Sequence, residues 1–303
     1  MSMLTSTLFT TLNKLINSRF ANTISNTLQN ISAHYDISNE MFEAFLSKDM
    51  TYSCAYFPPS LGGPDGDLIK SLPSDQQEKE DPIKKRKKQQ DVLELAQYAK
   101  IDLIIEKAKI RRGDRVLEIG TGWGSFAIRA VSRTGCSVET VTLSQEQKRL
   151  AEARITAAGL SDKIRVHLLD YRHLPTHFKG TTFHRIVSIE MIEAVGIEFL
   201  NTFFHVIHQC LHPSIGIAVF QVITIPEARF QRYLKINRFL SRQVDFIRKW
   251  IFPGGVLPTV TLITSGITEG SRGQLLIDSV QNIGPRTSFP SLQKQNRRGG
   301  IGC

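Results

Sequence analysis

The chain has 303 residues, of which 41% are hydrophobic and 22% are charged. Such a composition can bury enough apolar surface to offset chain entropy, so wholesale disorder is excluded. The length fits two domains, or one α/β domain with elaborations. Lys and Arg number 38 against 28 Asp and Glu, and the resulting net charge of +10 favours an anionic partner such as nucleic acid or a phospholipid surface.

The cysteines and the hydropathy of the chain limit which cellular compartment and which kinds of structural site are expected. Four cysteines lie far apart along the chain: Cys54, Cys136, Cys210 and Cys303. Without a C-x-x-C pair, neither a disulfide framework nor a zinc module is expected. No stretch approaches the about 20 apolar residues of a membrane-spanning helix. We expect a cytoplasmic protein, peripheral at most to a membrane; mitochondrial import is disfavoured because only Lys14 and Arg19 supply positive charge in residues 1–35.

The first 90 residues divide into two regions. Residues 1–57 are expected to begin with an amphipathic helix that packs on the core or on lipid, since apolar residues recur at helical spacing: Leu4, Leu8, Leu12, Leu15, Ile16 and Phe20. Residues 58–90 are rich in Pro and Gly and then in charge, and they end in a run of five basic residues at 84–88. This composition predicts a low-complexity charged insertion rather than a domain.

From residue 91 to 225 the sequence alternates between helical and strand patterns. Helices are expected at 91–108, 125–132 and 145–157, and strands at 115–119, 137–143, 164–168, 185–189 and 215–225. Such alternation implies right-handed crossovers and a largely parallel sheet. The predicted fold class is therefore α/β, a Rossmann-like sheet with helices on both faces.

A glycine-rich turn follows the first predicted strand of this region. The segment V-L-E-I-G-T-G-W-G-S, residues 116–125, places Gly120, Gly122 and Gly124 directly after the strand and before a helix. Missing side chains there let a ligand approach the backbone at a helix N-terminus. The spacing E-x-G-x-G-x-G resembles motif I of the S-adenosylmethionine methyltransferases.

Residues 226–285 are expected to form a helical substrate insertion and the end of the sheet. Aromatic and basic side chains alternate in its first part: Phe230, Tyr233, Phe239, Phe246 and Trp250 with Arg229, Arg232, Lys235, Arg238, Arg242, Arg248 and Lys249. This pattern suits lipid headgroups, with the apolar side lining an acyl channel; a solvated helix packed on the core is the alternative. No nucleic-acid recognition module is visible.

Several separated motifs resemble one family. They are A-H-Y-D-I-S-N-E-M-F (33–42), M-T-Y-S-C-A-Y-F (50–57), V-T-L-S-Q-E-Q (141–147), D-Y-R (170–172), I-V-S-I-E-M-I-E (186–193) and I-F-P-G-G (251–255). With the glycine turn, they make the chain similar to the cyclopropane fatty acid and mycolic acid cyclopropane synthases, as a eukaryotic-type member. The resemblance implies a class I methyltransferase that transfers a methyl or methylene carbon to the cis double bond of an unsaturated acyl chain, on a phospholipid at a membrane surface.

The resemblance also implies a set of cofactor-binding residues. Tyr52 and Ser53 would close over S-adenosylmethionine from an N-terminal helical lid formed by residues 1–57. The remaining implied contacts come from the sheet and its loops: Gly120, Thr121, Gly122, Thr142, Leu143, Gln147, Tyr171 and Arg172. Gln147 stands where many methyltransferases grip the ribose with an acid, and its amide can both donate and accept.

In the family, the alkene attacks the sulfonium methyl, and a bicarbonate ion removes a proton from the resulting carbocation. The implied groups around bicarbonate are the backbone N–H of Cys54, the backbone C=O of Ile189, the Glu193 carboxylate and the amide of Gln221, which replaces a His. The family also places a Tyr after I-G-P-H, and this Tyr is missing. No metal is implied.

The end of the chain departs from the family. After Pro285 the sequence runs into residues 286–303, which are expected to be an unrelated tail, as in a C-terminally truncated member. The last strand of the sheet would then be missing. An unpaired apolar edge at 215–225 predicts low solubility and weak activity.

Some residues and functions keep two interpretations. Cys54 is a nucleophile or, more often for a free Cys, a buried small residue. Glu190 and Glu193 lie one helical turn apart and form a carboxylate pair or a helix N-terminal cap cluster. A small-molecule N- or C-methyltransferase of the same family and a cofactor-binding protein without turnover are the alternative functions. The sequence leaves the oligomeric state open, a homodimer included.

Overall fold

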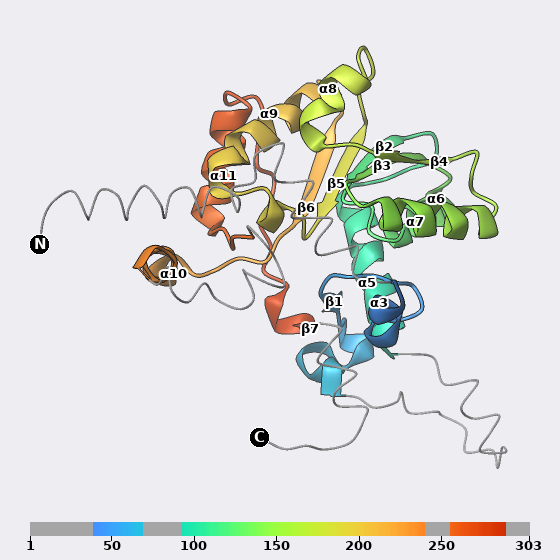
Figure 1. Cartoon of the computed structure of the whole chain (residues 1–303), viewed down its shortest axis with the longest axis horizontal. Helices are drawn as coiled ribbons and strands as arrows, with labels where there is room; N and C mark the ends of the chain where they lie inside the picture. The colour runs from blue at the N-terminus through green and yellow to red at the C-terminus, as the bar shows by residue number, and fades with distance from the viewer. Residues whose placement is uncertain (1–38, 69–91, 240–254, 289–303) are drawn as a thin grey trace, which may run out of the picture.

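A computed structural model describes residues 39–68, 92–239 and 255–288 (Figure 1). The amphipathic stripe expected in residues 1–35, the basic run at 84–88 and residues 240–251 of the aromatic, basic segment lie outside these ranges. So do residues 289–303 of the expected tail.

A five-stranded sheet forms the centre of the molecule. Its strands follow the order β4-β3-β2-β5-β6, and every neighbouring pair is parallel. The strands are β2 (Arg115–Ile119), β3 (Ser137–Thr142), β4 (Ile164–Leu168), β5 (Arg185–Ile189) and β6 (Ile217–Gln221). The parallel order confirms the predicted Rossmann-like α/β class, because parallel neighbours need crossover connections.

Helices cover both faces of the sheet (Figure 1). One face packs against α5 (Val92–Lys107), α6 (Ser125–Thr134) and α7 (Gln145–Ala157), and the other against α8 (Leu174–His177), α9 (Leu200–Cys210) and α11 (Val260–Gly270). Each face has its own buried apolar cluster, and β-branched strand residues supply its centre. Helix α10 (Glu227–Phe239) follows β6.

Local signals in the sequence explain where the crossover helices begin and end. The Ser144 hydroxyl accepts a hydrogen bond from Gln147 N–H at 3.2 Å and caps the start of α7. Helix α6 ends at Gly135, whose φ of 73° is left-handed. These connections place the loops after β2 and β3 at one edge of the sheet.

Strand β6 is shorter than the expected 215–225 and forms the edge of the described sheet. It pairs with β5, and all five of its residues are half-buried. The ladder ends because later backbone groups find other partners: Ile223 N–H donates to Glu193 Oε1, and Ile225 N–H donates to Pro258 O at 3.0 Å. Among the described residues no strand pairs with the outer side of β6, and the expected loss of the last strand stays a prediction.

The lid region contains α3 (Asn39–Phe45) and β1 (Ala55–Tyr56), followed by two short 3-10 helices at Pro59–Leu61 and Gly63–Leu68. Strand β1 pairs antiparallel with β7 (Thr287–Ser288). The first residues of the expected tail thus contact the lid, and the interpretation of residues 286–303 as an unrelated tail stays a prediction. Thr287 and Ser288 pair with strand β1 of the lid. A strand of two residues is too short to produce a periodic pattern in the sequence.

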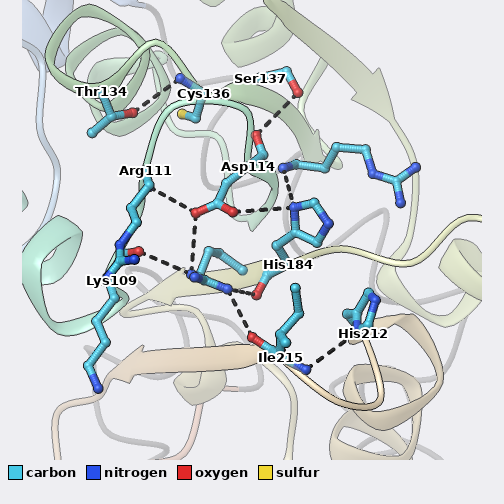
Figure 2. Close-up of polar contacts among 11 residues, drawn as sticks. Lys109, Arg111, Asp114, Thr134, Cys136, Ser137, His184, His212 and Ile215 are labelled. Carbon is cyan, nitrogen blue, oxygen red and sulfur yellow. Dashed lines mark hydrogen bonds and ion pairs between the residues drawn. The ribbon is translucent and has the colours of Figure 1, made fainter.

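The amino ends of the strands carry a polar network. Figure 2 shows Asp114, His184 and Ile215, which precede β2, β5 and β6, meeting in one cluster. Asp114 Oδ2 accepts a hydrogen bond from Arg111 N–H at 2.8 Å and lies 3.5 Å from Arg185 Nε. The Arg185 guanidinium donates to the carbonyls of His184 and Ile215 at 2.7 and 3.0 Å. One buried cation thus joins three strand starts.

Candidate functional site

A pocket lies at the opposite, carboxyl edge of the sheet, beneath the lid. In open parallel sheets, ligands bind at this edge. Most predicted cofactor residues line it: Tyr52, Ser53, Gly120, Thr121, Gly122, Thr142, Leu143, Gln147 and Tyr171, together with Ile189. Additional lining side chains, which the sequence did not single out for this role, are Met50, Glu118, Trp123, Leu169, Glu190 and Met191.

The glycine turn forms the floor of the pocket. Gly120 and Gly122 have φ values of 104° and 51°, which L side chains rarely adopt. The N–H groups of Gly120 and Thr121 both donate to Val141 O, at 3.0 and 3.1 Å. A Cβ added at Gly122 would meet no atom within 4 Å. The turn is therefore held firmly by β3 while its backbone stays open to a ligand.

Glu118 lies at the end of β2, just before this turn. Its side chain is buried, and burial raises the pKa of its carboxyl to about 8. Among the described residues, its Oε2 is a buried atom without a hydrogen-bond partner. Buried polar atoms of this kind are rare in folded proteins. Glu118 is therefore suited to bind a polar ligand. Its position in the E-x-G-x-G-x-G motif is the sequence signal that points to this role.

The loops after β3 and β4 supply the side walls. Thr142 Oγ1 donates to Gln147 Oε1 at 2.8 Å, which leaves the Gln147 amide N–H groups as donors for a ligand. The buried Tyr171 lines the pocket, and its hydroxyl has no partner in the described part of the chain. Arg172 does not line the pocket. It forms a bidentate pair with Asp170, at 2.8 and 2.6 Å, and so supports the turn that carries Tyr171.

Helix α5 holds the lid over the pocket. The Ser53 carbonyl accepts a hydrogen bond from Gln97 Nε2 at 2.8 Å, and Lys100 Nζ donates to the Ser53 hydroxyl. Lys100 is fully buried, which lowers the pKa of its ammonium to about 8. On the outer side, the Tyr52 ring packs against Phe42, with ring centroids 5.3 Å apart. Side-chain contacts from α5 and Phe42 thus hold the lid in place over the pocket.

A second cluster lies behind the pocket wall. Glu190 Oε1 accepts hydrogen bonds from Cys54 N–H at 3.0 Å and from Gln221 Nε2 at 2.7 Å. Cys54, Gln221 and Glu193 are not among the lining residues, whereas Glu190 is. The Glu190 side chain, which follows β5, therefore links the lid to β6 through one carboxylate oxygen.

Glu193 completes this cluster. Its Oε1 accepts a hydrogen bond from Ile223 N–H, and its Oε2 is buried without a partner among the described residues. Burial, followed by the nearby charge of Glu190, raises the pKa of Glu193 to about 8. Burial also raises the pKa of the Cys54 thiol, which therefore stays protonated and supports the buried rather than the nucleophilic interpretation.

The structure separates the two interpretations of the glutamates. The 3-10 helix at Ile192–Ala194 has no side-chain cap, and the Glu190 side chain contacts the lid and β6 instead. The sequence alone could not show this, because its partners lie 136 and 31 residues away.

Other kinds of site find no support in the described ranges. They contain no group of three His, Cys, Asp or Glu side chains placed to hold a metal ion. Within the same ranges, no helix is both long and apolar enough to cross a bilayer.

Comparisons with known proteins agree on one family. A family profile described as mycolic acid cyclopropane synthetase matches residues 22–286. The chain is 37% identical to tuberculostearic acid methyltransferase UfaA1 of Mycobacterium tuberculosis and 32% identical to cyclopropane-fatty-acyl-phospholipid synthase of Escherichia coli K12. Each match covers 83% of this chain, but only 50% and 51% of the relative. The chain thus spans about half the length of these relatives.

Comparison with solved structures supports the same family. The crystal structure of mycolic acid cyclopropane synthase CmaA1 complexed with SAH and CTAB aligns with a TM-score of 0.65 and 29% identity, over 86% of this chain and 78% of that chain. A geranyl diphosphate C-methyltransferase from Streptomyces coelicolor, at 16% identity and a TM-score of 0.54, shares the fold. With the matched profile over most of its length, the chain belongs to the mycolic acid cyclopropane synthetase family.

Proposed function

We propose that the protein transfers a methyl or methylene carbon from S-adenosylmethionine to the cis double bond of an unsaturated acyl chain on a phospholipid. The observation that carries this proposal is the pocket at the carboxyl edge of the sheet, with an open glycine turn on its floor and the Glu190 carboxylate in its wall. The relatives are named for methylation or cyclopropanation of fatty and mycolic acids, which supports an acyl acceptor.

The residues around the pocket fit S-adenosylmethionine. The open backbone at Gly120 and Gly122 would lie against the cofactor, Gln147 would bind the ribose hydroxyls, and Tyr171 would flank the adenine. The unpartnered Glu118 Oε2 would accept hydrogen bonds from the polar end of the cofactor. Bound there, S-adenosylmethionine supplies an electrophilic methyl group to the acceptor.

The lid has the task of excluding water. A carbocation on an acyl chain is captured by water unless the site is dry. Aromatic rings close the outer side of the pocket: Phe42 and Trp123 lie with ring centroids 4.8 Å apart, and the Tyr52 ring contacts both. Burial raises the pKa of the Tyr52 hydroxyl to about 12, so this wall stays uncharged at neutral pH.

The residues expected to hold bicarbonate do not fit that ion. The two N–H donors proposed for it, from Cys54 and Gln221, both donate to Glu190 Oε1. An anion placed on them would also face the Glu190 carboxylate, and like charges at such a distance repel. No step of the proposed reaction is therefore assigned to bicarbonate.

The positive net charge of the chain supports attachment to phospholipid. The net charge of +10 attracts anionic headgroups, and α10 carries Arg229 and Arg232 beside the buried Phe230. We propose that this helix approaches the membrane surface and that acyl chains enter the site from its side.

Product analysis tests the function. The purified protein is incubated with S-adenosylmethionine carrying a labelled methyl group and with vesicles of a cis-unsaturated phospholipid. Labelled lipid, one carbon heavier in the acyl chain, is the expected product, and vesicles of the saturated phospholipid serve as the control. Folded protein that binds the cofactor but labels no lipid would refute the proposal, and label on added small amines instead would identify a small-molecule methyltransferase.

A further inference from the structure

Glu190 has a backbone conformation that needs an explanation. It directly follows β5, and its φ is 50°, a left-handed conformation that glycine adopts freely and other residues adopt at a cost of about 1 kcal/mol or more. Strain of this kind persists where the surrounding structure holds it in place. Here it brings a carboxylate into the wall of the pocket, beside Ile189 and Met191.

Two N–H donors from distant segments hold that carboxylate. Cys54 N–H, from the lid, and Gln221 Nε2, from the edge strand β6, converge on Glu190 Oε1 at 3.0 and 2.7 Å. Hydrogen bonds to an ionised acceptor are about twice as strong as neutral ones. The pair of donors therefore stabilises negative charge on Glu190 and fixes its position relative to the pocket.

Glu193, Lys100 and Cys54 are the ionisable neighbours of Glu190. Glu193, three residues later, is buried, and its pKa is raised to about 8, so at neutral pH it carries a proton. The buried ammonium of Lys100 adds an attractive charge near Glu190. Cys54 contributes its N–H, and its thiol stays protonated. Of the two glutamates in the cluster, Glu190 is the one that lines the pocket.

We infer that Glu190 is the general base of the reaction and replaces a dissolved carboxylate-type ion such as bicarbonate. This inference rests on the proposed function. The carboxylate group of Glu190 and bicarbonate present the same planar, negatively charged oxygens to N–H donors. Here the Cys54 N–H and one amide N–H of Gln221 already bind the Glu190 carboxylate.

The proposed step balances as follows. The π electrons of the alkene form a carbon–carbon bond to the sulfonium methyl while the sulfur–carbon bond breaks, and a cation remains on the acyl chain. The electrons of one C–H bond of the transferred methyl then close the three-membered ring. The released proton passes to Glu190, which returns it to solvent after the product leaves.

The first experiment compares lipid labelling with and without bicarbonate. In buffer freed of carbon dioxide, the unmodified protein is expected to label cis-unsaturated phospholipid as fast as in buffer with bicarbonate. Glu190→Gly is expected to lose about 100-fold in rate without bicarbonate, the scale of a missing general base, and to recover when bicarbonate is added. Glu152→Gln, which changes an exposed glutamate paired with Lys148, is the matched control and should behave as the unmodified protein.

A binding measurement gives a readout besides activity. Bicarbonate titrated into the unmodified protein should release no heat, because the donors are occupied, whereas Glu190→Gly should bind it. Glycine relieves the strain at a φ of 50°, so this variant is expected to fold. Glu190→Gln keeps the shape of the side chain and fills the site with a neutral amide. It should lose activity without recovery in bicarbonate, and it serves if the glycine variant fails to fold.

The outcomes separate the two proposals. Lipid labelling that requires bicarbonate in the unmodified protein, or full labelling by Glu190→Gln without it, would overturn the role of Glu190 and leave the proposed function standing. No lipid labelling by the unmodified protein under either condition would overturn both.

Discussion

The two edges of the central sheet treat buried polar groups in opposite ways. At the amino edge, Arg185 donates to two carbonyls and lies beside the Asp114 carboxylate (Figure 2). At the carboxyl edge, buried oxygens of Glu118, Tyr171 and Glu193 have no partner among the described residues. Each such group costs free energy in the absence of a ligand. The polar groups of the amino edge thus stabilise the fold, whereas the carboxyl edge contains polar groups that a ligand could bind.

The largest expected effect comes from breaking the amino edge. Arg185→Ala would remove the cation beside Asp114 and the side-chain donor of two strand-start carbonyls. Removing one partner of a buried ion pair costs about 3–5 kcal/mol, so we expect the free energy of unfolding to fall by about 3 kcal/mol in urea denaturation. Cofactor affinity of the protein that remains folded should not change. Arg165→Ala, at an exposed arginine 4.0 Å from Glu139, is the control; an equal loss there would contradict the comparison.

The carboxyl edge should instead give a pH dependence. Glu118 and Glu193 have pKa values raised to about 8 from about 4.3 in the unfolded chain. Their protonated forms favour folding, so the contribution of these two groups to stability is fully present below about pH 4.3 and declines as the pH rises towards 8.

Each unit of pKa shift contributes about 1.4 kcal/mol, and urea denaturation across this range measures the decline. Glu118→Gln and Glu193→Gln should each flatten the profile, and Glu152→Gln should not. A profile that stays equally steep in both variants would contradict the assignment.

A smaller effect is expected from loosening the lid. Gln97→Leu removes the donor to the Ser53 carbonyl. The loss of one buried hydrogen bond, about 1–1.5 kcal/mol, should weaken cofactor binding by about tenfold, as measured by calorimetry. Gln274→Leu, at an exposed position beyond α11, makes the same chemical change away from the lid. Unchanged affinity in Gln97→Leu would show that α5 does not hold the lid.

The smallest effect on stability concerns the edge strand. Ile215 is 56% exposed just before β6, and its carbonyl, not its side chain, belongs to the amino-edge network. Ile215→Lys should therefore change the free energy of unfolding by less than about 0.5 kcal/mol. It should reduce self-association in light scattering, because charge protects an open edge from pairing. Aggregation that persists at the same protein concentration would point to a different apolar surface.

Local patterns predicted the fold to within a residue or two in most places. The bounds expected for β2, β4, β5 and α7 match the structure, because strand periodicity and helix formers are local properties. The strand expected at 215–225 is too long, since Ile223 and Ile225 bond outside the sheet. Its β-branched run continues past the point where the ladder ends.

The sequence predicted only those residues of the site that belong to a single local motif. The glycine turn and its neighbours reach the pocket as expected, because the strand before them sets their place. Arg172 instead pairs with Asp170. The role of Glu190 depends on Cys54 and Gln221, which only the folded chain brings together, and no local pattern encodes that contact.

The pairing of β1 with β7 has a consequence for biosynthesis. All five strands of the central sheet precede residue 222 in the chain, so they can assemble while the ribosome is still adding later residues. Strand β1 is made before the sheet, whereas its partner at Thr287–Ser288 is made after it. The β1–β7 pair can therefore form only after the residues of the central sheet have been made, when that sheet can already serve as a scaffold for it.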